Sequence, residues 1–303
     1  MIVISLWHLS HLLMGGSGMR VATLAAVLAC ALSGQAFAWG QEGHSIIAEI
    51  AQHRLSREAA GMVEQLLGKG HSLASVASWA DDTRDTRPET SNWHFVDIPL
   101  ARDNYDEAAD CHPTDEATRG DCLVNELKRL RNELRCATGD KKVEALKFAV
   151  HFVGDIHQPL HAVLEKQGGN DIIVDLFARG AKCTGSCIPQ HTYMKFHAAW
   201  DSGLIMATVW DWGRYVDLLE TDNGWLTTAE AQADGIDGGT PEQWAEETHK
   251  AAQTIWALLP ENSVLDDAYY QKVSPIVARQ LGLASLRLAK FLNDAYANQC
   301  PVP

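Results

Sequence analysis

Hydrophobic residues recur with a helical period in several long segments of the chain. In the first segment, Ile46, Ile47 and Ile50 fall on one stripe because they lie one, three and four residues apart. The second begins with Ser56, a preferred N-cap residue, and the third stops before Pro159. The pattern predicts helices at residues 41–55, 56–68, 141–158, 240–259 and 274–295.

Strand signal is weak along the same chain. Only residues 170–180, NDIIVDLFARG, are expected to form part of a small β-hairpin. Residues 101–121 and 180–190 contain cysteines, and we expect them to be loops held by disulfides. No repeat, low-complexity tract or long linker divides residues 39–303. We therefore expect a mainly α fold, with a single compact helical domain at 39–303, a small β-hairpin and disulfide-stapled loops.

Residues 1–38 are expected to be a leader. From Met19 onward the chain has a basic Arg20, an apolar run and a small-x-small ending at Ala38, which is the pattern of a cleaved signal peptide. Met19 is therefore the expected start of translation. The alternative is a membrane anchor, for which the apolar run is short. We expect a secreted or periplasmic protein that begins at Trp39 and has no membrane anchor after processing.

The composition limits the functions that the chain can have. Its 303 residues are 46% hydrophobic and 21% charged, so they can form a large core, and wholesale disorder is not expected. The net charge of −14 argues against a protein that holds polyanions by bulk electrostatics. Any phosphate chemistry would therefore need local positive charge from metal ions or a few arginines.

The cysteine count indicates disulfides. Of seven cysteines, Cys30 would leave with the leader, and an even number in an exported chain favours pairing. Cys122 and Cys136 flank a helical pattern at 123–134, and their separation of roughly 20 Å along a helix forbids a bond. Fifteen pairings are possible on paper, and the local pairs fit best. The expected bonds are Cys111–Cys122, Cys183–Cys187 and, by what remains, Cys136–Cys300.

Two His–Asp pairs carry the clearest chemical signal. His151 and Asp155 are four residues apart in a helical segment, so they share one face, and the chain can turn back at His161 after a proline. His197 and Asp201 have the same spacing. Imidazole and carboxylate are typical zinc ligands. The alternatives are a hydrogen-bonded pair in the core for the first and a solvated helix face for the second.

Further candidate ligands lie nearer the N-terminus. Asp81 and His94 each adjoin a tryptophan, in segments that do not form long helices. If cleavage follows Ala38, Trp39 has a free α-amine, which can chelate a metal together with the carbonyl oxygen of the same residue. His44 follows about one helical turn later. Because an α-amine has a pKa near 8, a metal can readily displace its proton.

The motifs WG(x)xGH, SWAD(xx)R, HF(x)D, H(xxx)D(xx)QPLH, GGN and H(xxx)D occur in this order in the chain. In this the chain resembles the S-one/P-one nuclease family, the secreted zinc-dependent single-strand nucleases and 3′-nucleotidases of fungi, plants and bacteria. From Trp39 to about Asp201 the resemblance consists of the shared motifs. In the rest of the chain it consists only of the helical character of the sequence. It implies the mainly α fold of the zinc-dependent phospholipase C and P-one nuclease type.

The resemblance also implies three Zn²⁺ per chain. Two of the zinc ions would form a close pair that shares Asp155 as a ligand, and the third zinc ion would lie beside this pair. By this likeness the ligands are Asp81, His94, His151 and Asp155 for one zinc, Trp39, His44 and Asp155 for its neighbour, and His161, His197 and Asp201 for the third. The remaining histidines are expected at the surface or in hydrogen bonds, and His157 is expected beside the site or facing solvent.

Five residues match catalytic and substrate-binding positions of the family. The resemblance implies that Asp81 and Arg84 are catalytic, that Phe95 and Asp97 bind the nucleoside by stacking and at the base edge, and that Asn170 lies near the scissile phosphate. The alternatives are a surface arginine and a plain Gly-Gly-Asn turn. The implied substrates are single-stranded DNA and RNA and 3′-nucleotides, hydrolysed to 5′-phosphate products, and no stable protein partner is expected.

One segment departs from the fungal pattern. A longer loop lies between Asn170 and His197, and it leaves the substrate preference open. Two other functions also remain open. One is a zinc-dependent phospholipase C, from a related family that shares the N-terminal tryptophan and the three-zinc arrangement. The other is an exported zinc-binding protein without catalysis. Phe95, Asp97 and the GGN motif favour nucleic acid.

Overall fold

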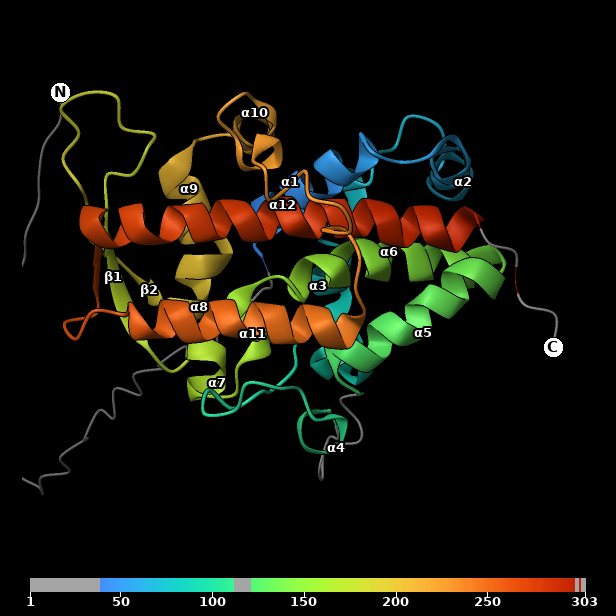
Figure 1. Ribbon diagram of the computed structural model, residues 1–303, viewed down its shortest axis with the longest axis horizontal. Helices are drawn as coiled ribbons and strands as arrows, with labels where there is room; N and C mark the ends of the chain where they lie inside the picture. Colours follow the sequence, from blue (N-terminus) through green and yellow to red (C-terminus); the bar gives the residue numbers. More distant parts are fainter. Residues whose placement is uncertain (1–38, 112–120, 298–299, 301–303) are drawn as a thin grey trace, which may run out of the picture. The chain divides into compact units, whose positions relative to one another are not determined.

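The computed structural model describes residues 39–111, 121–297 and Cys300 (Figure 1). Helices predominate in this part of the chain, as the sequence predicts. The leader, its cleavage site and the expected start at Met19 lie outside the described residues. So do residues 112–120 of the first expected loop.

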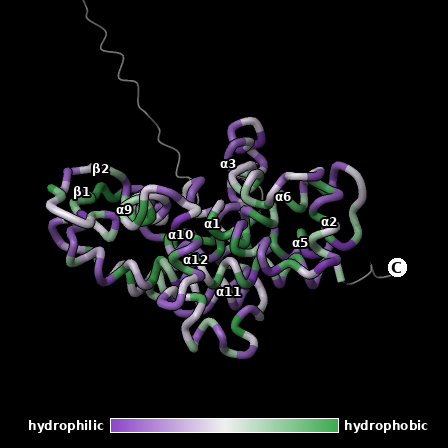
Figure 2. The backbone as a smooth tube through the Cα atoms, turned by 90° about the horizontal axis from the view of Figure 1, so that it is seen from above, coloured by the Kyte–Doolittle hydropathy of each residue, from purple (hydrophilic) through white to green (hydrophobic). Residues whose placement is uncertain are grey.

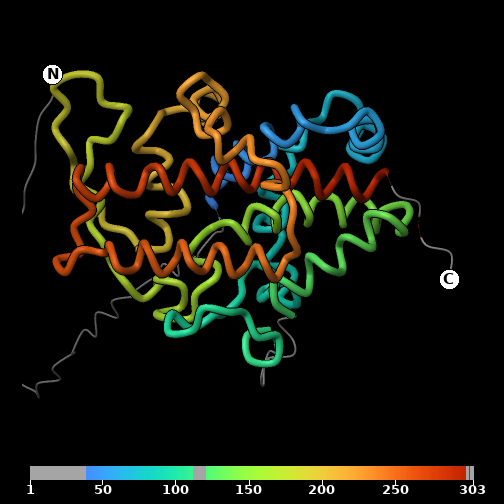
Figure 3. The backbone as a smooth tube through the Cα atoms, in the orientation of Figure 1, coloured from blue at the N-terminus to red at the C-terminus, as the bar shows by residue number. Residues whose placement is uncertain are grey.

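Long helices form the framework of the molecule. The first and last of them, α1 and α12, pack against each other, so helices from opposite ends of the described chain lie side by side (Figure 3). Helix α6 contacts α1, α5 and α12. The bounds are α1 (Gln41–Gln52), α2 (Arg57–Leu67), α5 (Leu123–Cys136), α6 (Gly139–Asp155), α10 (Trp212–Glu220), α11 (Pro241–Ala257) and α12 (Asp267–Ala297).

Shorter elements connect these helices and carry much of the site. They are α3 (Trp79–Thr83), α4 (Glu107–Asp110), α7 (Lys166–Gly169), α8 (Phe196–Ala198), α9 (Leu204–Thr208), a π-helical turn (Ala199–Gly203), and the 3-10 turns Ala74–Val76, Arg84–Thr86, Pro88–His94, Pro159–Ala162 and Trp225–Thr227.

The predicted helix starts at Ser56 and Thr240 are confirmed. The Ser56 side chain accepts a hydrogen bond from the backbone N–H of Ala59. Thr240 forms a capping box with Gln243, ahead of Pro241 at the first helical position. Each cap satisfies backbone N–H groups that a helix start otherwise leaves unpaired.

The predicted start of the last helix is wrong. We expected it at residue 274, but α12 begins at Asp267 and contains Pro275. Tyr269, Tyr270 and Val273 from the added turns are buried. Burial of these side chains stabilises the extra turns more than the hydrogen bond lost at the proline costs.

The predicted hairpin is confirmed, and a third strand joins it. Strand β1 (Ile173–Phe177) pairs antiparallel with β2 (Thr192–Lys195) and parallel with β3 (Val264–Asp266), in the order β2-β1-β3. With only three residues, β3 is too short to give a period-two signal in the sequence.

The described chain contains the three expected disulfides. They are Cys111–Cys122, Cys136–Cys300 and Cys183–Cys187. The second ties the end of α5 to a residue beyond α12, and the third closes a small loop between β1 and β2.

The core lies where α1, α6, α11 and α12 come together, and Figure 2 shows hydrophobic positions there. The stripe of Ile46, Ile47 and Ile50 is fully buried, as predicted. Trp210, by contrast, is 83% exposed. No helix among the described residues is long and apolar enough to cross a membrane.

Candidate metal centre and active site

All nine predicted ligand residues are buried in one region of the fold. They come from elements far apart in sequence, and α6 alone provides two of them. Trp39 precedes α1, His44 lies on α1, Asp81 on α3, His94 ends a 3-10 turn, His151 and Asp155 lie on α6, His161 lies in the turn after it, His197 lies on α8 and Asp201 in the π-helical turn.

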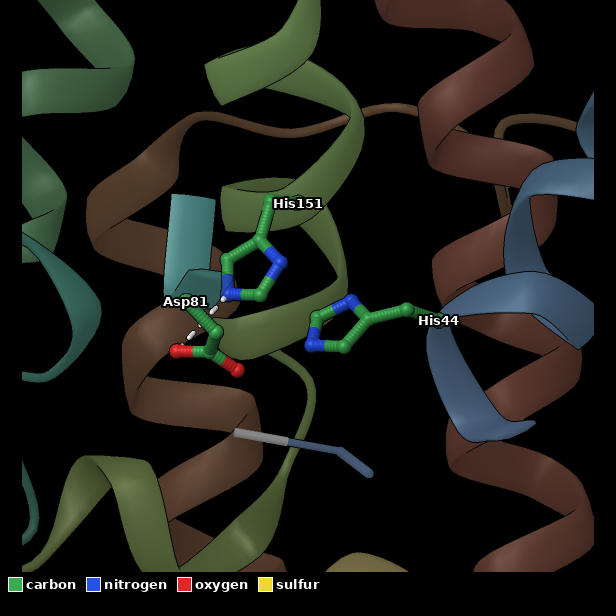
Figure 4. Close-up of side chains that lie close together, drawn as sticks. All are labelled: His44, Asp81 and His151. Carbon is green, nitrogen blue, oxygen red and sulfur yellow. Dashed lines mark ion pairs between the residues drawn. The ribbon is translucent and has the colours of Figure 1, made fainter. Parts of the chain in front are cut away.

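Asp155 is at the centre of the first group. Its Oδ1 lies 3.3 Å from His44 Nε2, and its Oδ2 lies 3.1 Å from His94 Nδ1 and 3.3 Å from His151 Nε2. Asp81 approaches from α3, with Oδ1 at 3.6 Å from His151 Nε2. Figure 4 shows the side chains of His44, Asp81 and His151 pointing toward one another from three separate helices.

A second group contains His161, His197 and Asp201. The Nε2 atoms of the two histidines are 3.1 Å apart, and His197 Nε2 is 3.7 Å from Asp201 Oδ2. Asp201 lies in a π-helical turn, in which the backbone hydrogen bond spans five residues instead of four. The sequence predicts the His197–Asp201 spacing, but it does not predict the π-helical turn.

Backbone carbonyl groups orient three of the histidine rings. In each ring Nδ1 donates a hydrogen bond, which leaves the lone pair of Nε2 directed into the site. The acceptors are Ala77 for His151 (2.7 Å), His94 for His161 (2.6 Å) and Gly168 for His197 (2.6 Å).

The carbonyl of Gly168 depends on a left-handed turn. Gly168 has φ +61°, and a Cβ at this position would lie 2.5 Å from the carbonyl oxygen of Leu160 and 3.2 Å from His197 Nδ1. Only glycine fits both the conformation and the space. The Gly-Gly-Asn motif therefore orients the ring of His197, in addition to forming the turn that the sequence indicated.

Gln158 is a site residue that the sequence analysis missed. Its Nε2 donates to Asp201 Oδ1 over 2.6 Å, and its Oε1 accepts from the backbone N–H of Leu160 over 2.6 Å. It therefore orients one carboxylate of the second group and caps the turn that holds His161. Its place directly before a proline was the available signal, because Pro at the first position of a turn favours a polar cap residue before it.

His157 is buried, so the alternative that it faces solvent is wrong. Its Nδ1 donates to the Val153 carbonyl oxygen over 2.7 Å, and its Nε2 accepts from Arg287 over 3.0 Å. Both ring nitrogens are occupied, so His157 is not a ligand, as predicted.

The buried polar atoms of the first group fit a cation. Among the described residues, several of their nitrogen and oxygen atoms have no hydrogen-bond partner, although they are shielded from water. Such atoms destabilise a fold unless something pairs with them. An imidazole and carboxylate donor set at this density is the kind that zinc binds. The atoms are Nδ1 and Nε2 of His44, Nε2 of His94 and His151, and Oδ1 of Asp81 and Asp155.

Burial also sets the protonation of the site. It is the largest cause that lowers the pKa of His44, His94 and His161, and it lowers the pKa of His197 to about 4. These rings are therefore neutral at pH 7, as metal ligands must be. Burial raises the pKa of Asp155 and Asp201 well above the usual range, so a cation that binds them displaces protons.

The chelator-treated protein should lose thermal stability as the pH falls from 6.5 to about 4.5. These four site histidines, whose pKa is lowered in the folded protein, take up protons only on unfolding, so each reduces the free energy of unfolding by up to about 1.4 kcal/mol per pH unit below 6.5. Asp155 and Asp201, whose pKa values are raised, have the opposite effect and increase stability as the pH falls, but they are fewer than the histidines. Melting curves at several pH values, with and without added Zn²⁺, test this; a constant or rising melting temperature on acidification contradicts it.

The predicted substrate residues differ in how they are connected to the metal groups. Arg84 lies close enough for its charge to lower the pKa of His94 and His161, and its Nη2 donates to the carbonyl oxygen of Ser91. Phe95 is half-buried and follows His94 directly in the chain. Burial, with a smaller effect of Asp110, raises the pKa of Asp97 to about 6.

Asn170 is tied to the turn that supports His197. Its Nδ2 donates to the Gln167 carbonyl oxygen over 2.9 Å, whereas its Oδ1 is buried without a hydrogen-bond partner.

The family model described as S1/P1 Nuclease matches residues 39–297. The chain belongs to the S1/P1 nuclease family. Endonuclease 2 of Arabidopsis thaliana is 31% identical over 289 residues, which cover 85% of this chain and 90% of that protein. Nuclease S1 of Aspergillus oryzae is 30% identical over 293 residues (89% and 95%), and nuclease P1 of Penicillium citrinum is 27% identical over 291 (86% and 99%).

The family membership confirms the resemblance that the motifs indicated. It also confirms the mainly α fold with its small sheet and disulfides, and the class of activity, a nuclease. The described His and Asp groups can hold metal ions, in agreement with the expected zinc dependence.

Proposed function

We propose that this protein is a secreted zinc-dependent phosphodiesterase that hydrolyses single-stranded DNA and RNA to 5′-phosphate products and removes phosphate from 3′-nucleotides. The observation that supports this most directly is the pair of adjoining buried His/Asp groups in a chain that matches the S1/P1 nucleases over residues 39–297. The proposed enzyme comprises residues 39–303 after loss of the leader and acts outside the cytoplasm.

The proposed centre holds three zinc ions. Asp155 reaches His44 with one carboxylate oxygen and His94 and His151 with the other, which is the geometry expected of a bridging ligand. The proposed ligands are Asp81, His94, His151 and Asp155 for the first ion, Trp39, His44 and Asp155 for the second, and His161, His197 and Asp201 for the third.

When bound, the zinc ions would polarise the phosphate and lower the pKa of water in the site. Asp81 orients the attacking water and accepts its proton; its Oδ1 has no hydrogen-bond partner of its own. Arg84 contributes positive charge beside the phosphate, where negative charge increases during the reaction. Because these charges are local, the enzyme can process a polyanion despite its net charge of −14.

Phe95 and Asp97 are proposed to select unpaired bases. A half-buried aromatic ring offers a face on which any base can stack, and a duplex hides the faces of its bases. The Asp97 carboxyl group, with a pKa of about 6, would meet the base edge. These residues favour nucleic acid over the alternative of a phospholipase C.

An assay of the purified protein on denatured DNA, RNA and 3′-AMP tests the proposal. We expect hydrolysis of all three, loss of activity with a chelator and recovery with Zn²⁺. Release of diglyceride from phosphatidylcholine without nuclease activity would show a phospholipase instead. Bound zinc without any turnover would show a non-catalytic zinc protein.

Phe95→Ala should weaken nucleotide substrates by about 1–3 kcal/mol through lost base stacking. The backbone at this position is held by hydrogen bonds from Leu123 N–H to the Phe95 carbonyl oxygen and from Val96 N–H to the His161 carbonyl oxygen, so the fold should persist. KM for 3′-AMP and the zinc content are the measurements. Phe95→Tyr, which keeps the ring, is the control. An equal loss on a phosphoester that has no base would make Phe95 a folding residue.

A further inference from the structure

A pocket of about 440 Å³ lies at the start of α1, and none of the proposed active-site residues lines it. Gln41, Glu42 and Ser45 of α1 form its floor, and its walls include Ser78 and Trp212. The two walls belong to residues 72–78 and to the start of α10, and both segments pack against α1 (Figure 1). The volume is within the range of small-molecule sites, about 300–1,000 Å³.

The pocket and the proposed nucleoside residues adjoin the metal centre from different sides. His44, which precedes the pocket residue Ser45, meets Oδ1 of Asp155, whereas His94, which precedes Phe95, meets Oδ2. A phosphodiester joins two nucleosides. If one base stacks on Phe95 and the phosphate lies at the metal centre, the second nucleoside extends away from Phe95, and the pocket lies beyond the other carboxylate oxygen.

The lining of the pocket favours a base over a phosphate. Among the described residues that line it there is no Lys, Arg or His, so no side chain there neutralises a phosphate. Trp212 is partly buried and provides an aromatic ring, on which any base can stack. The Glu42 carboxylate, also partly buried, has no hydrogen bond or ion pair with another described residue, so both of its oxygens can accept from a ligand.

A carboxylate of this kind distinguishes guanine from the other bases. Its two oxygens only accept hydrogen bonds, and guanine has two adjacent donors, N1–H and N2–H, on its Watson–Crick edge. Adenine and cytosine have an amino group beside an acceptor nitrogen, and uracil has carbonyl oxygens beside its N–H. Each of these bases would place an acceptor against a carboxylate oxygen, which leaves both without a donor.

We propose that this pocket binds the base on the 3′ side of the scissile phosphate and that it prefers guanine. Trp212 is the stacking ring, and Glu42 accepts from N1–H and N2–H. The proposal rests on the proposed nuclease function and adds a base preference to it. A 3′-nucleotide does not occupy the pocket, because it has no nucleoside beyond its phosphate.

Dinucleoside monophosphates that begin with adenosine test the proposal, since they differ only in the base that would enter the pocket. In the wild-type protein, kcat/KM for ApG should exceed that for ApA, ApC and ApU about tenfold. Glu42→Gln has nearly the same size but presents an N–H donor to the base, so it should reduce the ratio of ApG to ApA to about one. Trp212→Leu should lower kcat/KM for every dinucleotide about tenfold relative to that for 3′-AMP.

The matched control is Glu49→Gln. Glu49 also lies on α1, but it does not line the pocket, and it pairs with His53. Its ratio of ApG to ApA should equal that of the wild type.

Each outcome has a distinct meaning. If the wild-type protein cleaves neither 3′-AMP nor any dinucleotide, the proposed function fails. If it cleaves them and the four dinucleotides differ by less than about twofold, the guanine pocket is refuted while the function stands. The pocket is also refuted if Glu42→Gln lowers kcat/KM for ApG and for 3′-AMP by the same factor, because Glu42 would then support α1 and would not contact a base.

Discussion

Asp155→Asn is expected to remove both ions of the close zinc pair and to reduce nuclease activity to about 1% or less. The Asp155 carboxylate lies within 3.3 Å of a ring nitrogen of His44, His94 and His151, so it contacts every imidazole of the first group. Loss of outer residues that only orient a ligand already costs roughly 10–100-fold. Elemental analysis should fall from three zinc ions per chain to one, held by His161, His197 and Asp201.

The matched control is Asp82→Asn. Asp82 neighbours the proposed ligand Asp81 but is exposed, and its Oδ2 accepts a hydrogen bond from Ser78. It should retain full zinc content and activity. Three zinc ions in Asp155→Asn, or a wild-type value near one, would refute the bridging assignment. Circular dichroism of the variant with added Zn²⁺ distinguishes loss of the pair from loss of the fold, since metal binding and folding are coupled.

The proximity of the proposed ligand residues was predictable in part because helix geometry is local. His151 and Asp155 are four residues apart, which on any α-helix puts both side chains on one face. The order of the motifs along the chain supplied the remaining ligand positions by resemblance, and the structure brings all of them into one buried region. The long helices were predicted for the same reason, since a period of 3.6 is visible in the sequence.

The groups that orient those ligands were not predictable. The carbonyl oxygens of Ala77, His94 and Gly168 belong to the backbone, which is chemically the same at every residue. Which carbonyl meets which ring depends on tertiary packing. Gln158 also bonds to a residue that is 43 positions away, and no local pattern encodes that contact.

The misread elements have a similar explanation. The start of α12 differs from the expected residue 274 because burial of Tyr269 and Tyr270 favours the extra turns before Pro275. Trp210 lies exposed with Lys182 over its ring, although a large apolar residue is usually buried. In both cases packing overrides an average preference.

A protein that keeps any residue before Trp39 is expected to lack one zinc of the close pair and most of its activity. The main chain at this position is held firmly: Gly40 N–H donates to the Asp201 carbonyl oxygen over 2.9 Å, and a Cβ on Gly43 would lie 2.9 Å from Trp39 Cβ. Trp39 itself is fully buried. Its nitrogen is therefore fixed near the site whether or not a residue precedes it, and only its chemistry changes.

That chemistry decides the result. In a peptide the nitrogen lone pair is delocalised and cannot bind zinc without loss of the amide proton, whereas a free α-amine with a pKa near 8 readily releases its proton to a metal. Expression of residues 39–303 behind a Met-containing tag that a protease removes completely gives both forms of one chain. We expect about two zinc ions and little activity before cleavage, and three ions and full activity afterwards. N-terminal sequencing of the exported protein should begin at Trp39; full activity of the extended form would show that its amine is not a ligand.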